Sequence, residues 1–411
     1  MKINKHCFPN GLRLVHYEDT STQMVALNIV YDVGARDEHP EHTGFAHLFE
    51  HLMFGGSAHI PDYDTPLQLA GGENNAWTNN DITNYYLTVP KPNVETAFWL
   101  ESDRMLELAF SEQSLEVQRG VVMEEFKQRC LNQPYGDVGH LFRPLAFRVH
   151  PYRWPTIGKE LSHIEQATLD EVKSFFYCFY APNNAVLAVT GNISWDETVK
   201  FTEKWFAPIP RRDVPVRQLP QEPEQTQERR LTVERNVPLD ALFMGYHMCS
   251  REGADYYAFD ILSDILSNGR SSRLNRRLVQ EQNIFSGIDA YISGTRDAGL
   301  LQISGKPAAG VSLEQAEAAV RKELEELQRS PVDGQELEKV KNKFESTQIF
   351  GNINYLNVAT NLAWFELTGK AEDIDLEVER YRSVTTEQLH TVAQRTFCES
   401  NAVVLYYKSD K

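Results

Sequence analysis

The stretch from Gly44 to Gly56, GFAHLFEHLMFGG, constrains the fold of this 411-residue chain more than any other stretch. Its large apolar side chains recur at i, i+3, i+4, i+7 and i+8, so they form one stripe that can pack on a core. Thr43 is a suitable N-cap and the two final glycines are a suitable stop, which predicts a helix of about three turns. His47, Glu50 and His51 then lie on the side opposite the stripe.

The two histidines stand one helical turn apart, which lets both imidazoles bind one metal ion. The order H-x-x-E-H is the inverse of the H-E-x-x-H motif of zinc peptidases. Zinc in such a site takes one further protein ligand and keeps an open position for a water, whose pKa it lowers to about 7. Glu50, beside that water, can take its proton and pass it to the leaving amine. The alternative is a helix with two half-buried histidines and a solvated glutamate.

A second helix, expected at residues 114–129, offers candidates for the further ligand. Glu125 follows His51 by seventy-four positions, and the neighbouring Glu124 competes with it for any role at the metal. Taken alone, either residue is an ordinary exposed helix charge, and the spacing does not choose between them.

A polar, glycine-rich piece at residues 71–78 leads into a strand expected at residues 85–89. One interpretation of this pair is an ordinary β-hairpin. The other is an edge strand beside the histidine helix that pairs with an extended peptide.

Charge and cysteine content limit the partners and the compartment. The formal net charge is −17 and the pI is near 5.2, which argues against a nucleic-acid partner and an anionic membrane surface. Five scattered cysteines indicate free thiols in a reducing compartment, not a disulfide frame or a cysteine metal site. We find no signal peptide and no apolar run approaching the length of a membrane span, so we expect a cytoplasmic protein.

The second half of the sequence repeats a pattern of the first half. Thr168 lies sixteen residues before an N-A-V run at 184–186, and Thr385 lies sixteen residues before another at 401–403. A strand followed by a helix that ends at glycine also occurs in both halves. Two domains of one fold are therefore expected.

Proline- and glutamine-rich residues 213–229 are predicted to form a linker between these domains. The first domain, residues 1–212, carries the histidine motif, and the second covers residues 230–411. In the second domain the motif positions fall on Asp260, Ser263 and Asp264. The second copy thus lacks the imidazoles.

The chain resembles the zinc peptidases of the M16, or pitrilysin/insulinase, family, and is most similar to short members related to the mitochondrial processing peptidase. The resemblance covers nearly the whole chain. It rests on the N-G-L start at 10–12, His47-Leu48-Phe49-Glu50-His51, G-G-x-x-N-A-x-T at 71–78, E-S-D-R-M at 101–105, Q-R-x-V-V-x-x-E at 118–125, H-P-Y at 150–152, Gly158 and G-R-S-S-R-L at 269–274.

This resemblance implies an α+β fold of two homologous domains, each a mainly antiparallel β-sheet flanked by helices, the metallopeptidase M16 or LuxS-like fold. It implies one Zn²⁺ per chain, bound by His47, His51 and Glu125, with Glu50 as the general base. The family's distant glutamate ligand thus falls on Glu125 and not on Glu124. The resemblance also places Asn75, Ala76 and Thr78 on the strand that pairs with substrate.

Two departures from the family pattern stand out. Some relatives have a second glutamate seven residues before the ligand glutamate, where this chain has Gln118. Active members also use an Arg and a Tyr from a non-catalytic domain to bind substrate and the oxyanion, and these positions fall on Val279 and Ser286. Neither side chain can do that work.

The expected function is that of a zinc endopeptidase acting on short or unfolded peptides. We expect it to be the catalytic subunit of a two-chain enzyme whose second M16-like subunit supplies the Arg and Tyr. A homodimer is the other arrangement, and it would need Arg273, Arg276 or Arg277 to substitute for the missing groups. The alternative function is a binding or scaffold subunit that keeps zinc without proteolysis.

Overall fold

A computed structural model describes residues 1–410, which form two compact units. Unit 1 comprises Met1–Leu131, Trp154–Pro220 and Ile349–Leu376. Unit 2 comprises Asn132–Arg153, Gln221–Gln348 and the chain from Glu377 on. The units therefore differ from the continuous domains expected at residues 1–212 and 230–411, because each half of the sequence contributes one segment to the other unit.

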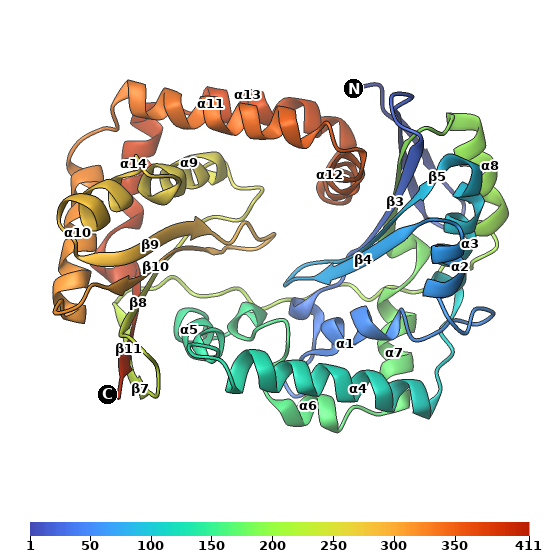
Figure 1. The fold of residues 1–411 in the computed structure, drawn as a ribbon, viewed down its shortest axis with the longest axis horizontal. Coiled ribbons are helices and arrows are strands. Elements are labelled where there is room, and N and C mark those ends of the chain that lie inside the picture. Colours follow the sequence, from blue (N-terminus) through green and yellow to red (C-terminus); the bar gives the residue numbers. More distant parts are fainter. Residues whose placement is uncertain (411) are drawn as a thin grey trace. The chain divides into compact units, whose positions relative to one another are not determined.

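Unit 1 is built on a six-stranded sheet in the order β1-β2-β6-β3-β5-β4 (Figure 1). All neighbouring strands are antiparallel except β2 and β6, which are parallel. The central strand β3 is buried along almost its whole length, as its apolar sequence on both faces indicates. The strands are β1 (Asn4–Cys7), β2 (Arg13–Glu18), β3 (Met24–Tyr31), β4 (Glu73–Thr78), β5 (Thr83–Pro90) and β6 (Ala185–Gly191).

One face of this sheet carries the main core of unit 1, to which most of its helices contribute apolar side chains. These helices are α1 (Phe45–Leu52), α2 (Asp64–Leu69), α3 (Val94–Leu106), α4 (Glu112–Phe126), α6 (Leu161–Glu165), α7 (Leu169–Phe179) and α8 (Trp195–Trp205). The other face is covered by α12 (Tyr355–Thr368), which comes from the second half of the sequence. Small residues such as Ala359 and Ala363 pack against Ala26 and Val30 of β3 there, so helix and sheet lie close together.

Unit 2 has a five-stranded sheet in the order β7-β11-β8-β10-β9. Its parallel pair, β7 and β11, is followed by three antiparallel neighbours, the same order and directions as β2-β6-β3-β5-β4. The sheets therefore share one topology, which confirms the two-domain α+β fold. The strands are β7 (Arg229–Arg235), β8 (Ala241–His247), β9 (Phe285–Ile292), β10 (Leu300–Pro307) and β11 (Ala402–Ser409).

Helices cover both faces of the second sheet as well. The main core of unit 2 includes apolar residues of α9 (Tyr256–Ser267), α10 (Leu313–Arg329), α11 (Gly334–Gly351), α13 (Glu377–Ser383) and α14 (Thr386–Thr396). The other face packs on α5 (Val138–Ala146), which comes from the first half of the sequence. Gly245 of β8 permits this contact, because a β-carbon there would lie 2.8 Å from the ring of Phe142.

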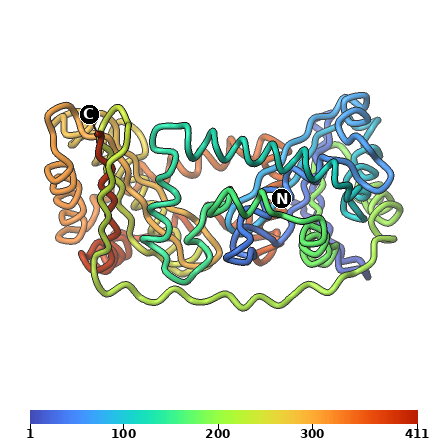
Figure 2. The backbone as a smooth tube through the Cα atoms, turned by 90° about the horizontal axis from the view of Figure 1, so that it is seen from below, coloured from blue at the N-terminus to red at the C-terminus, as the bar shows by residue number. Residues whose placement is uncertain are grey.

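The predicted linker is extended, and residues 210–228 contain no helix or strand (Figure 2). Polar contacts hold it nevertheless. In unit 1, Arg217 pairs with Asp32 and Asp37. In unit 2, the carboxylate of Glu222 accepts hydrogen bonds from three consecutive backbone N–H groups, those of residues 148–150, at 2.8–3.1 Å.

None of the helices within residues 1–410 combines the length and the apolar character that a membrane span requires.

Candidate metal centre

Helix α1 carries the histidine motif, and it begins and ends differently from the prediction. It covers Phe45–Leu52, so it is shorter than three turns. Its N-cap is Gly44, with φ of 90°, and not Thr43. The backbone N–H groups of Gly44 and Ala46 donate to the two carboxyl oxygens of Glu38, each at 2.9 Å. A carboxyl group six residues before the N-cap therefore replaces the expected local cap.

Glu38 is buried and lies at the base of this helix. Burial raises its pKa to about 8, against the opposing effect of the two backbone N–H donors. Thr43 has a different role, because its hydroxyl oxygen accepts the backbone N–H of Lys159 at 2.7 Å. The N-terminus of α1 is thus fixed by contacts to Glu38, which precedes it in the sequence, and to Lys159, which follows it.

Helices α1 and α4 bring His47, His51 and Glu125 together, with ligand atoms all within 4.8 Å of one another. Oε2 of Glu125 lies 3.5 Å from Nε2 of His47 and 3.4 Å from Nε2 of His51. Two ligands at about 2.1 Å from a tetrahedral ion are about 3.4 Å apart, so these separations match a zinc site. Glu124, by contrast, is 57% exposed and its nearest cation is Lys127, at 3.8 Å.

The chemical state of these side chains also fits a metal. Burial lowers the pKa of His47 to about 4, so the imidazole is neutral near pH 7, as a metal ligand must be. Its Nδ1 is buried and has no hydrogen-bond partner among residues 1–410. The guanidinium of Arg129 lies 2.7 Å from Oε1 of Glu125, which leaves Oε2 facing the imidazoles.

Glu50 lies on α1 between the two histidines in sequence and is half-buried. Burial raises the pKa of its carboxyl group, and a side-chain hydrogen bond with Thr78 opposes that shift. A raised pKa moves a carboxyl group toward the range in which it can both accept and return a proton. Thr78 belongs to β4, so this contact ties the edge of the sheet to the motif.

Strand β4 is at the edge of the sheet and pairs only with β5 among the described strands (Figure 1). Ala76 and Thr78 are half-buried, and Ala76 packs on the core to which α1 contributes. Asn75 is exposed on the opposite side. The Ala76 N–H donates to Oδ1 of Asn75 at 2.8 Å instead of to β5, which shows that it faces the open edge.

The positions that depart from the family pattern have ordinary structural roles. Gln118 lies on α4 with its amide near Gly55. Val279 packs against the core of unit 2, and Ser286, exposed on β9, donates to the carbonyl of Lys306 at 3.1 Å. Arg273, Arg276 and Arg277 each pair with a glutamate within unit 2.

The repeat of the motif in unit 2 has no comparable cluster. Asp260, Ser263 and Asp264 lie on α9, where Asp260 accepts a hydrogen bond from the Tyr381 hydroxyl. Among residues 1–410, His47, His51 and Glu125 form the one group of three ligands close enough to share a metal ion.

Sequence reasoning missed two contributors to the site. Glu38 gave no signal, because its carboxyl reaches the helix across a loop and not from a capping position. Arg129 could have been found, since it lies four residues after Glu125 and ion pairs at that spacing are common on helices.

These features define a class of protein: two units of one topology, of which one carries an inverse zinc-peptidase motif and a distant glutamate. The profile of the insulinase family, peptidase family M16, matches residues 13–137, and that of the peptidase M16 inactive domain matches residues 166–344. The chain belongs to the M16 peptidase family.

Similar proteins span its full length. The chain is 26% identical over 405 residues to zinc protease PqqE of Helicobacter pylori, which covers 97% of this chain and 91% of that protein. It is 25% identical over 406 residues to YmxG of Bacillus subtilis, an uncharacterised zinc protease, with 98% of each chain covered. The crystal structure of a protease from Helicobacter pylori superposes with a TM-score of 0.94 at 26% identity and covers 99% of both chains.

Proposed function

We propose that this chain is a zinc-dependent endopeptidase that hydrolyses short or unfolded peptides. The observation that carries the proposal is the convergence of His47, His51 and Glu125 beside Glu50. The names of its relatives as zinc proteases support the choice of metal. One zinc ion per chain would be held by these two imidazoles and one carboxylate.

The residues of the site divide the reaction between them. Zinc, when bound, supplies a Lewis acid and lowers the pKa of a bound water. Glu50 would accept a proton from the attacking water and return it to the leaving amine. The Thr78 hydroxyl lies beside the Glu50 carboxylate and favours its ionised form. Arg129 holds Oε1 of Glu125, so that the other oxygen faces the imidazoles.

Strand β4 supplies the substrate-pairing edge in this proposal. An extended peptide would add to the sheet beside β4, where the Ala76 N–H faces outward. The side chain of Asn75, which now accepts that N–H, would give way to a peptide carbonyl. Ala76 and Thr78 point toward the side of α1, so a paired peptide would lie next to Glu50.

The absence of the family's Arg and Tyr favours an enzyme of two different chains. Val279 and Ser286 cannot bind an oxyanion as those groups do. Arg273, Arg276 and Arg277, the nearby candidates in a homodimer, are already paired with glutamates. We therefore propose that a second M16-like subunit supplies the missing pair.

A second candidate function is a zinc-binding scaffold subunit without proteolysis. It is favoured by the same missing groups and by the match of residues 166–344 to a domain described as inactive. The two functions differ in one measurable way, since only the first predicts cleavage when the chain is combined with a subunit that carries the Arg and Tyr.

The ligand set is tested with a pair of adjacent variants. Glu125→Gln should lower zinc affinity at least about tenfold, because a carboxylate ligand becomes a neutral amide. Glu124→Gln is the matched control, since that side chain is exposed and does not belong to the group of possible ligands, and it should keep one zinc per chain. Zinc content after dialysis, measured by atomic absorption, decides. Equal zinc content in the two variants would overturn the assignment.

A further inference from the structure

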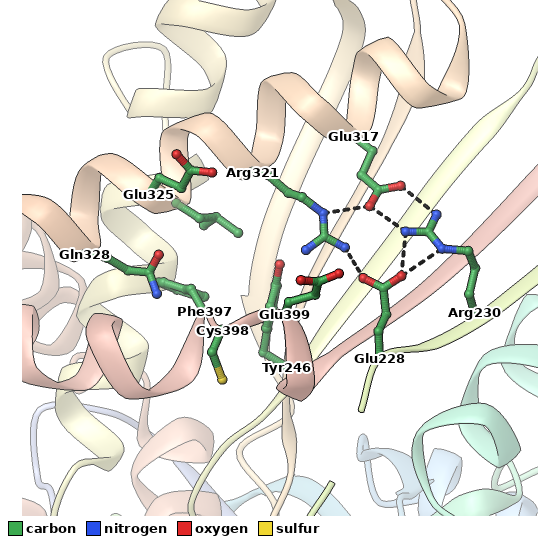
Figure 3. A pocket seen from close by; sticks show the side chains of 11 residues that line it. Glu228, Arg230, Tyr246, Glu317, Arg321, Glu325, Gln328, Phe397, Cys398 and Glu399 are labelled. Atoms are coloured by element: carbon green, nitrogen blue, oxygen red, sulfur yellow. Dashed lines mark hydrogen bonds and ion pairs between the residues drawn. The ribbon is translucent and has the colours of Figure 1, made fainter. Parts of the chain in front are cut away.

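Unit 2 contains a cavity of about 470 Å³ that has no role in the proposed peptidase site (Figure 3). It opens between α10, the start of β7, the buried face of β8 and the turn that follows α14. All of its lining residues belong to unit 2. They are Glu228, Arg230, Tyr246, Glu317, Arg321, Leu324, Glu325, Gln328, Phe397, Cys398 and Glu399.

One wall of the cavity is a closed network of two guanidinium groups and two carboxylates. Arg230 donates to both oxygens of Glu317, at 2.7 and 2.8 Å, and also pairs with Glu228. Arg321 pairs with the same two carboxylates. Each guanidinium group in the wall therefore contacts both carboxylates. Neither guanidinium group is available to bind an anionic ligand.

The rest of the lining adds negative charge. Glu325 and Glu399 give the cavity two more carboxylates than guanidinium groups. Glu325 pairs with Arg329, which is 73% exposed, so the solvent screens that pair. Glu399 is exposed, and its carboxylate forms no ion pair or hydrogen bond with any residue from 1 to 410. An anion would be repelled here, whereas a cation would be attracted.

The Tyr246 side chain supplies an independent sign of a ligand. It is only 1% exposed, and Figure 3 shows its hydroxyl pointing into the cavity. In the described part of the chain this hydroxyl has no hydrogen-bond partner. By contrast, the Tyr406 hydroxyl nearby donates to Glu317. The Tyr246 oxygen is therefore free to accept a hydrogen bond from a ligand group that enters the cavity.

Apolar and aromatic surface completes the lining. The rings of Tyr246 and Phe397 meet edge to face with centroids 5.2 Å apart, and Leu324 lines the same cavity. Such surface can bury the alkyl stem of a long side chain while its charged end stays polar.

We infer that this cavity binds an organic cation, namely an ammonium or guanidinium group on a short alkyl stem. The charged head lies against Glu399, with the Tyr246 oxygen as an acceptor, and the stem packs on Phe397. A free amine or amino acid and the Lys or Arg side chain of a polypeptide share this chemistry. The cation does not react; it is bound.

The test compares probes that differ in charge and not in shape. The Nα-acetyl forms of L-argininamide and L-citrullinamide, called argininamide and citrullinamide below, are titrated into the full chain by isothermal calorimetry at constant ionic strength. Acetylation removes the α-ammonium charge, so only the guanidinium group of argininamide is charged. Argininamide should bind with one site per chain, and citrullinamide at least about tenfold more weakly, since it lacks the charge. The same pair of residues within acetyl-Gly-X-Gly-amide distinguishes the sources: tighter binding of the peptide identifies a polypeptide side chain, and tighter binding of the free amide identifies a small amine.

Variants locate the binding to this cavity. Glu399→Gln should weaken argininamide binding about tenfold, and Tyr246→Phe severalfold, while the ring of the latter keeps its packing. Glu314→Gln, on α10 but outside the cavity, is the matched control and should bind as the wild type does. Thermal unfolding verifies that each variant is folded. Equal affinity for the two amides, or wild-type affinity in both cavity variants, would overturn the inference.

Discussion

Replacing Glu38 with glutamine is expected to change the stability of the protein in opposite directions at low and high pH. Both Glu38 oxygens accept backbone N–H groups at the start of α1. Glutamine keeps one acceptor and places an NH₂ donor against the other N–H group. One buried N–H then lacks a partner, which costs about 1–3 kcal/mol.

The pH dependence follows from the raised pKa of Glu38. Its pKa is about 8 in the folded protein and 4.5 in an ordinary glutamate. Between these values the folded chain holds a proton that the unfolded chain has lost, so wild-type stability falls as pH rises. In this range the free energy of unfolding of the wild type falls by about 1.4 kcal/mol per pH unit. The glutamine variant lacks this dependence, because glutamine does not titrate. The variant is therefore the less stable protein at pH 5, equals the wild type at a pH between just above 5 and about 7, and is the more stable one at pH 8.

Chemical denaturation followed by tryptophan fluorescence at pH 5, 6, 7 and 8 measures this difference. Trp154, which is 2% exposed and donates its indole N–H to Ala35, reports on the same region. Glu41→Gln, in the exposed part of the same loop, is the control and should show no crossover. A deficit of Glu38→Gln that grows with pH would refute the reasoning, because it would mean that Glu38 is ionised and caps α1 as a charge.

Three further predictions rest on other parts of the fold. Arg104 and Glu101 form an ion pair in which both side chains are only 1% exposed, so Arg104→Met leaves a buried carboxylate without its cation. Thermal unfolding should show that the free energy of unfolding falls by about 3–5 kcal/mol. A decrease under about 1 kcal/mol would contradict this. Hydrogen bonds from Arg230, Tyr406 and Arg321 outweigh burial and lower the pKa of Glu317 to about 2. Glu317→Gln should therefore lower the free energy of unfolding by up to about 3 kcal/mol at pH 7, and this difference should fade as pH falls from 4.5 toward 2. A difference that is the same at pH 7 and pH 3 would exclude the ionised Glu317 carboxylate as its origin. Ala76→Pro removes the N–H that faces the open edge, so KM for peptides should rise about tenfold with little change in unfolding temperature; an unchanged KM would argue against pairing at β4.

The parts of the site that could be predicted from the sequence are those that depend on local geometry. His47 and His51 are one helical turn apart, so their shared direction follows from the helix period alone. Glu125 could be preferred to Glu124 only through the family resemblance, because no local rule relates two helices seventy-four residues apart. The structure supplies the missing physical reason, since Oε2 of Glu125 lies near both Nε2 atoms.

Features that depend on contacts distant in sequence were not predictable. The periodicity of α5 and α12 marks each as a helix with an apolar side, but it does not say which sheet that side covers. Each packs on the sheet formed mainly by the other half of the chain, and so the compact units differ from the sequence halves. The cap of α1 was missed for the same reason, because Glu38 reaches Gly44 and Ala46 through a loop.

The most direct test of the central claim is the activity of a zinc-loaded Glu50→Gln variant. Wild type and variant, each with one zinc per chain, are assayed on a set of quenched fluorescent peptides, alone and with an M16 chain that carries the Arg and Tyr. If Glu50 is the general base of a zinc peptidase, the variant keeps its zinc and its cleavage rate falls at least about a hundredfold. Cleavage by the variant at the wild-type rate, or a wild type that binds zinc and cleaves nothing even with that partner, would contradict the account.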